Sequence, residues 1–342
     1  RERTMDSGLD SDLDSDIDSD LDSLLARFMA ERSLPDSYQS QVRRWLAPLS
    51  EQLSDRCRGN QGPLLVGVSG CQGSGKSTFA AALALLLEAQ GLRVAVLSLD
   101  DFYLPRAERA RRATALHPLF ATRGVPGTHD LALALATLNR LCAASSSNEP
   151  SCDPSSDPSY EDKKGEIQAG LNGEENAASL PLPRFDKASD EPMPQRDWPR
   201  VDRRVEVVLF EGWCLAAQPL PRTHPDLAAP CNELERVEDP DGSWRRRVND
   251  YLAEYQALFA TIDFLILLQA PSFDCVLPWR LKQERMLQKS AAGIGVMDET
   301  ALVRFVQHFE RLTRHCLATL PDQADVVFEL DTEQQITARR DA

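Results

Sequence analysis

A glycine-rich loop between an apolar run and an Ala- and Leu-rich segment constrains the fold of this chain more than any other feature. Residues 64–78 read LLVGVSGCQGSGKST, so the apolar run opens directly into a complete G-x-x-x-x-G-K-[ST] pattern. Gly70, Gly73 and Gly75 allow backbone angles that a side chain would forbid, and consecutive N–H groups can then turn toward phosphate oxygens at the start of a helix. We therefore expect a nucleoside triphosphate site, since the strand, loop and helix context that the pattern requires is present.

The polar positions of this loop have defined partners on a nucleotide. Lys76 is expected to reach the terminal phosphates, and Ser77 supplies the hydroxyl expected to ligate Mg²⁺. The residues expected to bind the nucleotide are Gly70, Gln72, Gly73, Ser74, Gly75, Lys76, Ser77 and Thr78. ATP and Mg²⁺ are the expected cofactors, and the lack of a guanine-reading N-K-x-D motif mildly favours ATP over GTP.

The charge of the chain is concentrated in two segments. The formal net charge is −15, but residues 1–24 carry nine acidic against two basic residues, and residues 143–178 carry eight against two. The remainder is close to neutral, which argues against a nucleic-acid-binding ATPase, because such proteins present a basic face to phosphates. The eight cysteines form no C-x-x-C pair, and the sequence contains no run of about eighteen apolar residues. We expect a cytoplasmic protein that binds neither nucleic acid nor membrane.

Low-complexity segments divide the chain. Residues 1–35 are predicted to be an acidic, largely disordered tail, because the segment has high charge and few core-forming residues. Residues 36–60 are expected to contain a helix that packs on the core. Its apolar positions at helical spacing are Tyr38, Val42, Trp45, Leu46 and Leu49. Residues 61–342 are expected to form one kinase domain with an acidic surface insertion at 143–179, and a protein partner for the acidic segments stays an open alternative.

Five short apolar runs predict a parallel sheet. They are the run before the glycine loop and residues 92–99, 205–210, 263–269 and 325–330, each separated from the next by enough chain for a helical crossover. This pattern is typical of a sheet that is buried on both faces. We predict an α/β P-loop NTPase fold: a doubly wound, mainly parallel five-stranded sheet with helices on both faces and a helical lid at residues 278–300. Ligands in such sheets bind at the carboxyl ends of the strands.

Acidic residues follow two of these runs. Asp100 and Asp101 come after residues 92–99, where a carboxylate can face the γ-phosphate opposite Lys76 and accept the proton of an attacking hydroxyl. Glu211 follows residues 205–210, at a place suited to orienting water or a metal ion. Taken singly, the Asp100–Asp101 pair is more typical of a helix or turn cap, and Glu211 is just as typical of an acid in a turn. Together they predict a phosphoryl-transfer site, with Lys76, Asp100 and Glu211 as catalytic residues and Ser77, Asp100 and Glu211 around the metal.

An ordered set of motifs resembles the plant-type D-glycerate 3-kinases. The set comprises the G-C-Q-G-S-G-K-S-T loop, L-D-D-F-Y-L at 99–104, G-T-H-D-L at 127–131, P-R-F-D-K at 183–187 and L-F-E-G-W at 209–213. These enzymes belong to a wider group of P-loop kinases that includes uridine kinase, pantothenate kinase and phosphoribulokinase. The resemblance covers nearly all of residues 64–331 outside the insertion. The loop alone is common to many nucleotidases, whereas the ordered set is much more specific.

The resemblance implies roles for individual residues. Asp100 corresponds to the general base of the wider group. The implied substrate residues are Asp101, Tyr103, His129, Asp130, Arg184 and Lys187. Arg184 and Lys187 suit the carboxylate of glycerate, which a cationic fork holds well. Arg280 and Arg285 resemble lid arginines that close on the nucleotide phosphates and exclude water.

The expected function is an ATP-dependent kinase that phosphorylates the 3-hydroxyl of D-glycerate to give 3-phosphoglycerate. Two alternatives stay open: a kinase of the same group with another acceptor, such as a nucleoside or pantothenate, and an ATP-binding switch protein whose acidic segments recruit a partner. Asp100, Arg184 and Lys187 favour a small anionic acceptor, since a switch needs no acceptor base. Dependence of ATP consumption on an added small molecule rather than an added protein discriminates between them.

Overall fold

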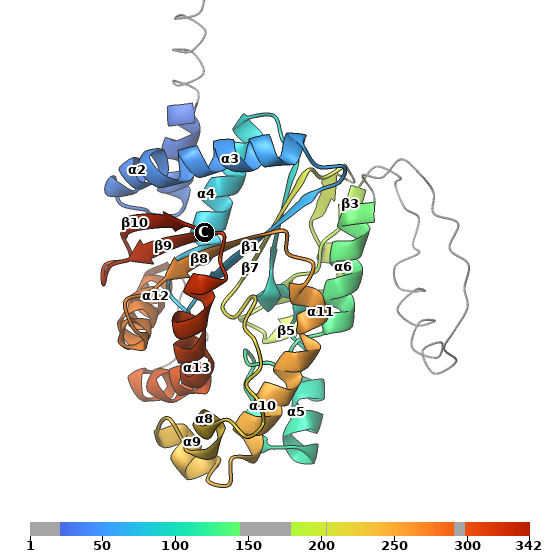
Figure 1. Ribbon diagram of the computed structural model, residues 1–342, viewed down its shortest axis with the longest axis vertical. Coiled ribbons are helices and arrows are strands. Elements are labelled where there is room, and N and C mark those ends of the chain that lie inside the picture. The colour runs from blue at the N-terminus through green and yellow to red at the C-terminus, as the bar shows by residue number, and fades with distance from the viewer. Residues whose placement is uncertain (1–20, 144–178, 203, 291–297) are drawn as a thin grey trace, which may run out of the picture.

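A six-stranded sheet forms the centre of the molecule (Figure 1). The computed structural model describes residues 21–143, 179–202, 204–290 and 298–342. The strand order across the sheet is β10-β9-β8-β1-β7-β2. These strands are β1 (Leu64–Gly70), β2 (Val94–Ser98), β7 (Val207–Gly212), β8 (Phe264–Gln269), β9 (Val326–Leu330) and β10 (Ile336–Asp341).

Five of the six strands are those predicted from the sequence, and they run parallel to one another. The predicted total of five is wrong by one, because β10 adds an antiparallel strand at the β9 edge. β10 reads ITARRD, and most of its residues are polar and partly or fully exposed. An edge strand of this composition gives no apolar run from which it could have been predicted.

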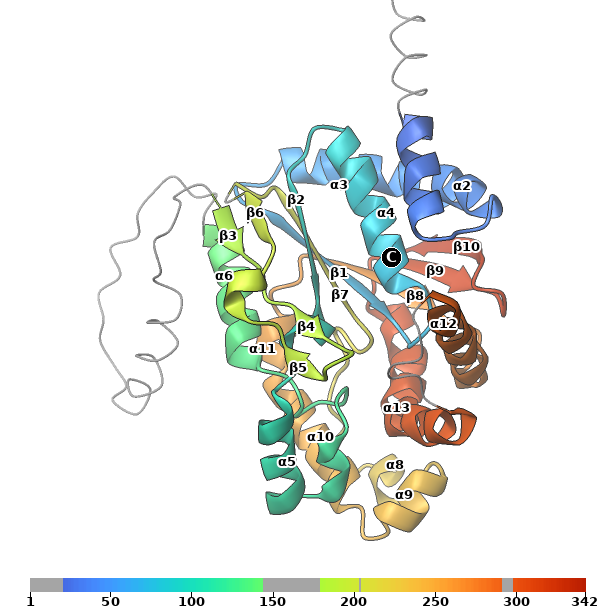
Figure 2. The same ribbon diagram turned by 180° about the vertical axis from the view of Figure 1, so that it is seen from behind.

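Helices cover both faces of the sheet, as expected for a doubly wound fold (Figures 1 and 2). The side chains of β1 alternate between the two layers: Val66 packs with α3 and α4, whereas Leu65 packs with α6 and α11. The helices are α2 (Ser37–Gln41), α3 (Ala47–Arg58), α4 (Lys76–Ala89), α5 (Arg106–Ala115), α6 (Leu131–Ala143), α8 (Pro225–Ala228), α9 (Glu233–Glu238), α10 (Ser243–Glu254), α11 (Gln256–Phe259), α12 (Val276–Ser290) and α13 (Glu299–Thr319).

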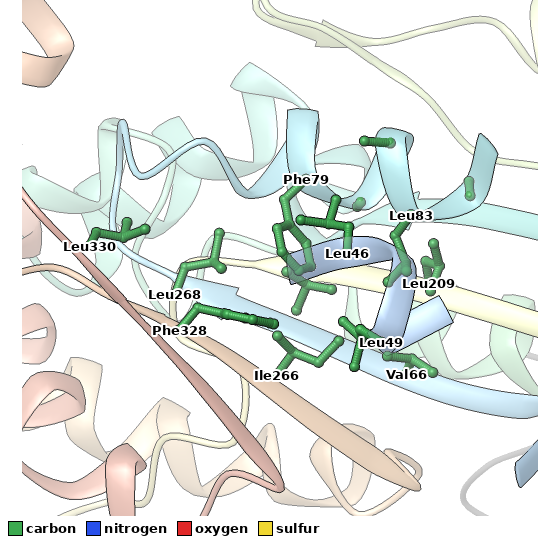
Figure 3. Packing of buried hydrophobic residues seen from close by; sticks show 14 of the residues in the cluster. Leu46, Leu49, Val66, Phe79, Leu83, Leu209, Ile266, Leu268, Phe328 and Leu330 are labelled. Carbon is green, nitrogen blue, oxygen red and sulfur yellow. The ribbon is translucent and has the colours of Figure 1, made fainter. Parts of the chain in front are cut away.

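The N-terminal segment is more ordered than the sequence predicts. Residues 21–31 are helical, and Leu25 and Phe28 on this helix are buried in the same core as α4. The boundary of the predicted disordered tail at residue 35 is therefore wrong, because apolar residues at helical spacing continue to its end. A short π-helical stretch, Val42–Leu46, joins α2 to α3. The buried Leu46 and Leu49 lie beside Phe79 and Leu83 (Figure 3).

Parts of three predicted regions lie outside the described residues: 1–20 of the tail, 144–178 of the insertion and 291–297 of the lid. The chain emerges from the insertion into two small sheets, one pairing β3 (Ser179–Pro181) with β6 (Arg200–Asp202) and one pairing β4 (Phe185–Asp186) with β5 (Glu191–Pro192). Within the described ranges, no helix combines the length and the apolar character needed to cross a membrane.

Candidate active site

The glycine-rich loop joins the end of β1 to the first turn of α4. Gly73 and Gly75 have φ angles of 81° and 86°, in the left-handed region that favours glycine. Gly75 is the N-cap of α4, so the loop ends where backbone N–H groups lack helical partners. A Cβ at Gly70 would lie 2.7 Å from the Ser74 hydroxyl oxygen. The backbone therefore has the shape that binds a phosphate at a helix N-terminus.

Strand register brings Glu211 to this loop. In β7, Glu211 pairs with Val68 of β1 on one side and with Ser98 of β2 on the other. Ser77 donates a hydrogen bond of 2.7 Å to Glu211 Oε1, and Lys76 Nζ lies 3.9 Å from Glu211 Oε2. Glu211 is 5% exposed, and its Oε2 atom is buried without a hydrogen-bond donor.

A divalent cation fits this arrangement. A buried carboxylate oxygen that lacks a donor is energetically costly, and a cation next to the Ser77 hydroxyl would compensate for it. The described part of the chain contains no group of three or more His, Cys, Asp or Glu residues that could hold a metal ion by themselves. Mg²⁺ is usually bound by one or two protein oxygens together with phosphate and water, and Ser77 and Glu211 supply two such oxygens.

Asp100 and Asp101 lie in a short 3-10 turn (Leu99–Phe102) at the end of β2. Ser98 and Asp101 form a capping box: Asp100 N–H donates to Ser98 Oγ, and Ser98 N–H donates to Asp101 Oδ2 at 3.1 Å. Burial raises the pKa of Asp101 to about 6, despite the opposing charge of Arg184. Asp101 thus serves as a cap, and it also lies beside Arg184, a residue predicted to bind the substrate.

Two cations from the β4–β5 hairpin reach these acids. Lys187 Nζ donates to Asp100 Oδ2 at 2.6 Å, and Arg184 donates to Asp101 Oδ2 at 3.2 Å. Burial raises the pKa of Asp100, but the charges of Lys187 and Lys76 outweigh it and hold that pKa well below its usual range. The charge of Asp100 in turn raises the pKa of Lys187. The structure therefore brings Asp100, Asp101, Arg184 and Lys187 together.

An aromatic stack extends from Asp100 into the core. Tyr103 donates to Asp100 Oδ1 at 2.6 Å, and its ring stacks on His129 with 4.6 Å between centroids. His129 Nδ1 lies 2.6 Å from the Tyr255 hydroxyl, which accepts from Gly127 N–H. If Tyr255 donates its own proton to His129 Nδ1, the Tyr255 hydroxyl and Nδ1 each have a hydrogen-bond partner. This assignment puts the imidazole proton on Nε2. His129 Nε2 is buried without a partner.

Two predicted site residues have other contacts. Asp130 accepts a hydrogen bond from Leu133 N–H at 2.9 Å at the start of α6, the contact of a helix cap. The Arg280 guanidinium pairs with Glu284 at 2.6 Å and with Gln283 at 2.7 Å. Its backbone is nevertheless close to the loop, since a Cβ at Gly73 would lie 3.5 Å from Arg280 N. Arg285 is exposed on α12.

Sequence reasoning missed the residues that hold the hairpin in place. Asp190 pairs with Arg109 at 2.7 Å and also with Arg123. The Arg109 side chain is 2% exposed. These partners are 67 to 81 residues apart, so no local sequence pattern indicates that they pair. Tyr255, the partner of His129, lies 126 residues away from it and was missed for the same reason.

Comparisons with known proteins identify relatives of this chain. A family model described as the methylmalonyl Co-A mutase-associated GTPase MeaB matches residues 32–103, which include the loop and the Asp100–Asp101 pair. The uncharacterized kinase mug58 of Schizosaccharomyces pombe is 31% identical over 282 residues, which cover 76% of this chain and 88% of that protein. The chloroplastic D-glycerate 3-kinase of Arabidopsis thaliana is 28% identical over 248 residues, or 69% of this chain but only 44% of the plant protein.

Solved structures support the fold. The D-glycerate 3-kinase of Cryptococcus neoformans var. grubii superposes with a TM-score of 0.63 at 24% identity, covering 86% of this chain and 97% of that one. The protein YGR205w gives a TM-score of 0.59 at 21% identity, covering 89% and 96%. The fold is that of the P-loop NTPases, which implies that the chain binds a nucleotide. The chain belongs to the family of the fission-yeast kinase, a family of ATP-dependent P-loop small-molecule kinases related to glycerate kinase.

Proposed function

We propose that this kinase transfers the γ-phosphoryl group of ATP to the 3-hydroxyl of D-glycerate, giving 3-phosphoglycerate and ADP. The observation that carries the proposal is the pair of cations at the end of β2, where Lys187 and Arg184 contact Asp100 and Asp101. A cation next to a candidate base suits an acceptor that carries both a carboxylate and a hydroxyl. The name of the plant relative and the ordered motifs point to the same acceptor.

The nucleotide side uses the loop and the residues next to it. The N–H groups of the loop and Lys76 bind the phosphates, and Lys76 stabilises the negative charge that develops between the β- and γ-phosphates. Ser77 and Glu211 would hold Mg²⁺, and the bound ion would neutralise phosphate charge. Arg280 and Arg285 lie on α12, the helix at the start of the predicted lid. When the lid closes, Arg280 would leave its partner Glu284 and bind a phosphate of ATP.

The acceptor side depends on exchanging the partner of Lys187. In this structure Lys187 neutralises Asp100, so Asp100 is a weak base. When the glycerate carboxylate takes Lys187 as its partner, Asp100 loses its nearest positive charge and becomes a better proton acceptor. The 3-hydroxyl oxygen then forms a bond to the γ-phosphorus, the bond to the β,γ-bridging oxygen breaks, and Asp100 takes the hydroxyl proton. Arg184 and the Nε2–H of His129 are the further donors for acceptor oxygens.

The test is ATP turnover with Mg²⁺ on a panel of D-glycerate, L-glycerate, uridine and pantothenate, with each product identified by mass spectrometry. The proposal expects 3-phosphoglycerate with D-glycerate and much slower turnover with the uncharged nucleoside. Phosphorylation of uridine or pantothenate in preference to D-glycerate would assign the other acceptor class. ATP hydrolysis that responds to none of the four would instead favour a switch protein.

A further inference from the structure

A cavity of about 580 Å³ opens beside the glycine loop, and neither Asp100 nor Lys187 lines it. Most of its lining comes from four parts of the chain: the N-terminal segment 32–41, the loop and first turn of α4, one turn of α12, and the connection from β9 to β10 with the strand ends beside it. Leu46 and Leu268 of β8 complete the lining. Ser74, Gly75 and Thr78 of the loop and the first turn of α4 are among its lining residues. The cavity is therefore continuous with the place where the phosphates bind.

Glutamine side chains hold these walls together. Gln334, in the β9–β10 connection, donates to the carbonyl of Gly73 and accepts from Lys282 at 3.2 Å. Gln334 has a φ of 68°, a left-handed conformation that non-glycine residues rarely adopt and that surrounding contacts must maintain. Gln41 accepts from Ile336 N–H at 3.1 Å and so ties the N-terminal segment to β10. The cavity is built by specific contacts between segments far apart in sequence.

The cavity has the size and lining of a small-molecule site. Pockets for such ligands usually measure about 300–1,000 Å³ and combine apolar walls with a few polar groups. Leu34, Tyr38, Phe79 and Ile336 supply apolar and aromatic surface, and Lys282 and Gln283 supply polar atoms. Leu34 and Tyr38 are half-buried and line the cavity, and both also pack against the core cluster that contains Val42 and Leu46. Leu34 and Tyr38 therefore rest on the core and leave part of their apolar surface open to the cavity.

We propose that residues 32–41 form one wall of the nucleoside site, so that the base and ribose of ATP bind in this cavity while the triphosphate lies on the glycine loop. The inference rests on the proposed function, since it takes ATP as the ligand of the loop. The N-terminal segment then acts in nucleotide binding and does more than pack on the core. A nucleoside seated here would rest against Tyr38 and Leu34, because base–aromatic stacking and apolar burial both favour that placement.

The test separates the nucleoside from the phosphates. Dissociation constants for Mg-ATP and for inorganic tripolyphosphate with Mg²⁺ are measured by calorimetry for the parent, for Tyr38→Ala, which removes part of the wall, and for Leu34→Trp, which fills the cavity. Ser40→Ala is the matched control, since Ser40 is exposed on the same helix as Tyr38 and does not line the cavity. Both cavity variants are expected to weaken ATP binding roughly tenfold, while tripolyphosphate binding changes by less than about twofold.

The outcomes are distinct. Unchanged ATP affinity in both cavity variants overturns the inference, and so does an equal loss of ATP and tripolyphosphate affinity, which would place the effect on the loop or on folding. Product formation from D-glycerate by the parent tests the proposed acceptor separately. A selective loss of ATP affinity in a protein that leaves D-glycerate untouched still supports the nucleoside wall. A parent that binds neither ATP nor tripolyphosphate overturns both proposals.

Discussion

The nucleotide side and the acceptor side of the candidate site are built in different ways. The phosphate loop is one contiguous stretch between β1 and α4, and its shape comes from local backbone conformation at Gly73 and Gly75. The acceptor side is assembled from side chains 83 to 87 residues apart, with Arg184 on Asp101 and Lys187 on Asp100. A local motif specifies the nucleotide side, whereas side-chain contacts between distant parts of the chain specify the acceptor side.

This difference has a chemical consequence. The loop presents backbone N–H groups, whose positions change little with the identity of nearby surface residues. The acceptor side presents ion pairs that hold both carboxylates until a ligand replaces one partner. A substitution on the nucleotide side should therefore affect every reaction of ATP, whereas one on the acceptor side should affect only reactions of the acceptor.

The largest expected effects are the losses of phosphoryl transfer in Lys76→Ala, on the nucleotide side, and in Asp100→Asn, on the acceptor side. Lys76→Ala should lower phosphoryl transfer by about 10²–10³-fold, since one electrostatic donor to the transition state is lost. Asp100→Asn should lower turnover by about 10²–10⁴-fold, the range for a general base. ATP affinity should survive better in the Asp100 variant, because Asp100 lies on the acceptor side. Steady-state kinetics together with ATP titration measure both quantities.

Arg58→Ala is the control for these two variants, since it removes a cation from the exposed end of α3. It should leave both turnover and ATP affinity as in the parent. Turnover by Asp100→Asn equal to that of the parent would remove Asp100 from the role of base. Equal loss of ATP affinity in both variants would contradict the separation of the two sides.

The same separation explains what the sequence could predict. The five parallel strands and the loop were predicted because each is a local pattern: a short apolar run or a fixed spacing of glycines, Lys76 and Ser77. The acids at the ends of β2 and β7 could be placed near the loop because parallel strands end at one edge of a sheet. Register then set Glu211 beside Ser77, which agrees with the expected proximity.

Contacts between residues far apart in the sequence could not be predicted. Nothing local to Asp190 indicates that it pairs with the buried Arg109, and nothing near Gln334 indicates that its side chain binds the Gly73 carbonyl. Asp130 was assigned to the substrate from its motif, whereas its observed contact caps α6. A capping acid and a substrate-binding acid look alike in sequence, because the same side chain serves both purposes and only its tertiary surroundings distinguish them.

Lys187→Met sharpens the comparison on the acceptor side. The variant keeps most of the side-chain length and removes the charge, so the Michaelis constant for D-glycerate should rise roughly tenfold, as expected for losing one charge-assisted hydrogen bond. The Michaelis constant for ATP should stay unchanged. Arg196→Met is the matched control, an exposed cation 83% accessible in the same segment. A rise in both Michaelis constants, or an equal effect of the control, would show that Lys187 has no specific part in acceptor binding.

A comparison of Gly73→Ala with Gly91→Ala tests how closely α12 approaches the glycine loop. Both glycines have positive φ, but a Cβ at Gly91 meets nothing within 4 Å, whereas one at Gly73 would lie 2.6 Å from Trp279 Cβ. Gly91→Ala should cost only the backbone strain, about 1–2 kcal/mol of unfolding free energy. Gly73→Ala should cost about 1–3 kcal/mol more from the clash, and it should also weaken ATP binding. Urea unfolding and ATP titration decide this, and equal effects of the two variants would refute the close approach of α12 to the loop.

The stability of the protein is also expected to depend on pH. Burial lowers the pKa of His129 from 6.5 to about 4, even though the charge of Asp100 opposes that shift. Between these two values the unfolded chain binds a proton that the folded protein does not, so stability falls as the pH drops from 6.5 toward 4. Asp101 contributes the opposite sign over part of this range, because its folded-state pKa is raised to about 6.

His129→Gln isolates the histidine, since Asp101 is present in both proteins and its contribution cancels in the difference. The glutamine can accept from Tyr255 but does not titrate. The slope of unfolding free energy against pH between 6.5 and 4 should therefore become less steep by up to about 1.4 kcal/mol per pH unit. Urea unfolding at several pH values measures the slope, and data above pH 7.5 provide an internal reference because His129 is neutral in both states there. Parallel curves for parent and variant would mean that His129 is not held neutral by burial, and the aromatic stack would then offer the acceptor a cation in place of a neutral donor.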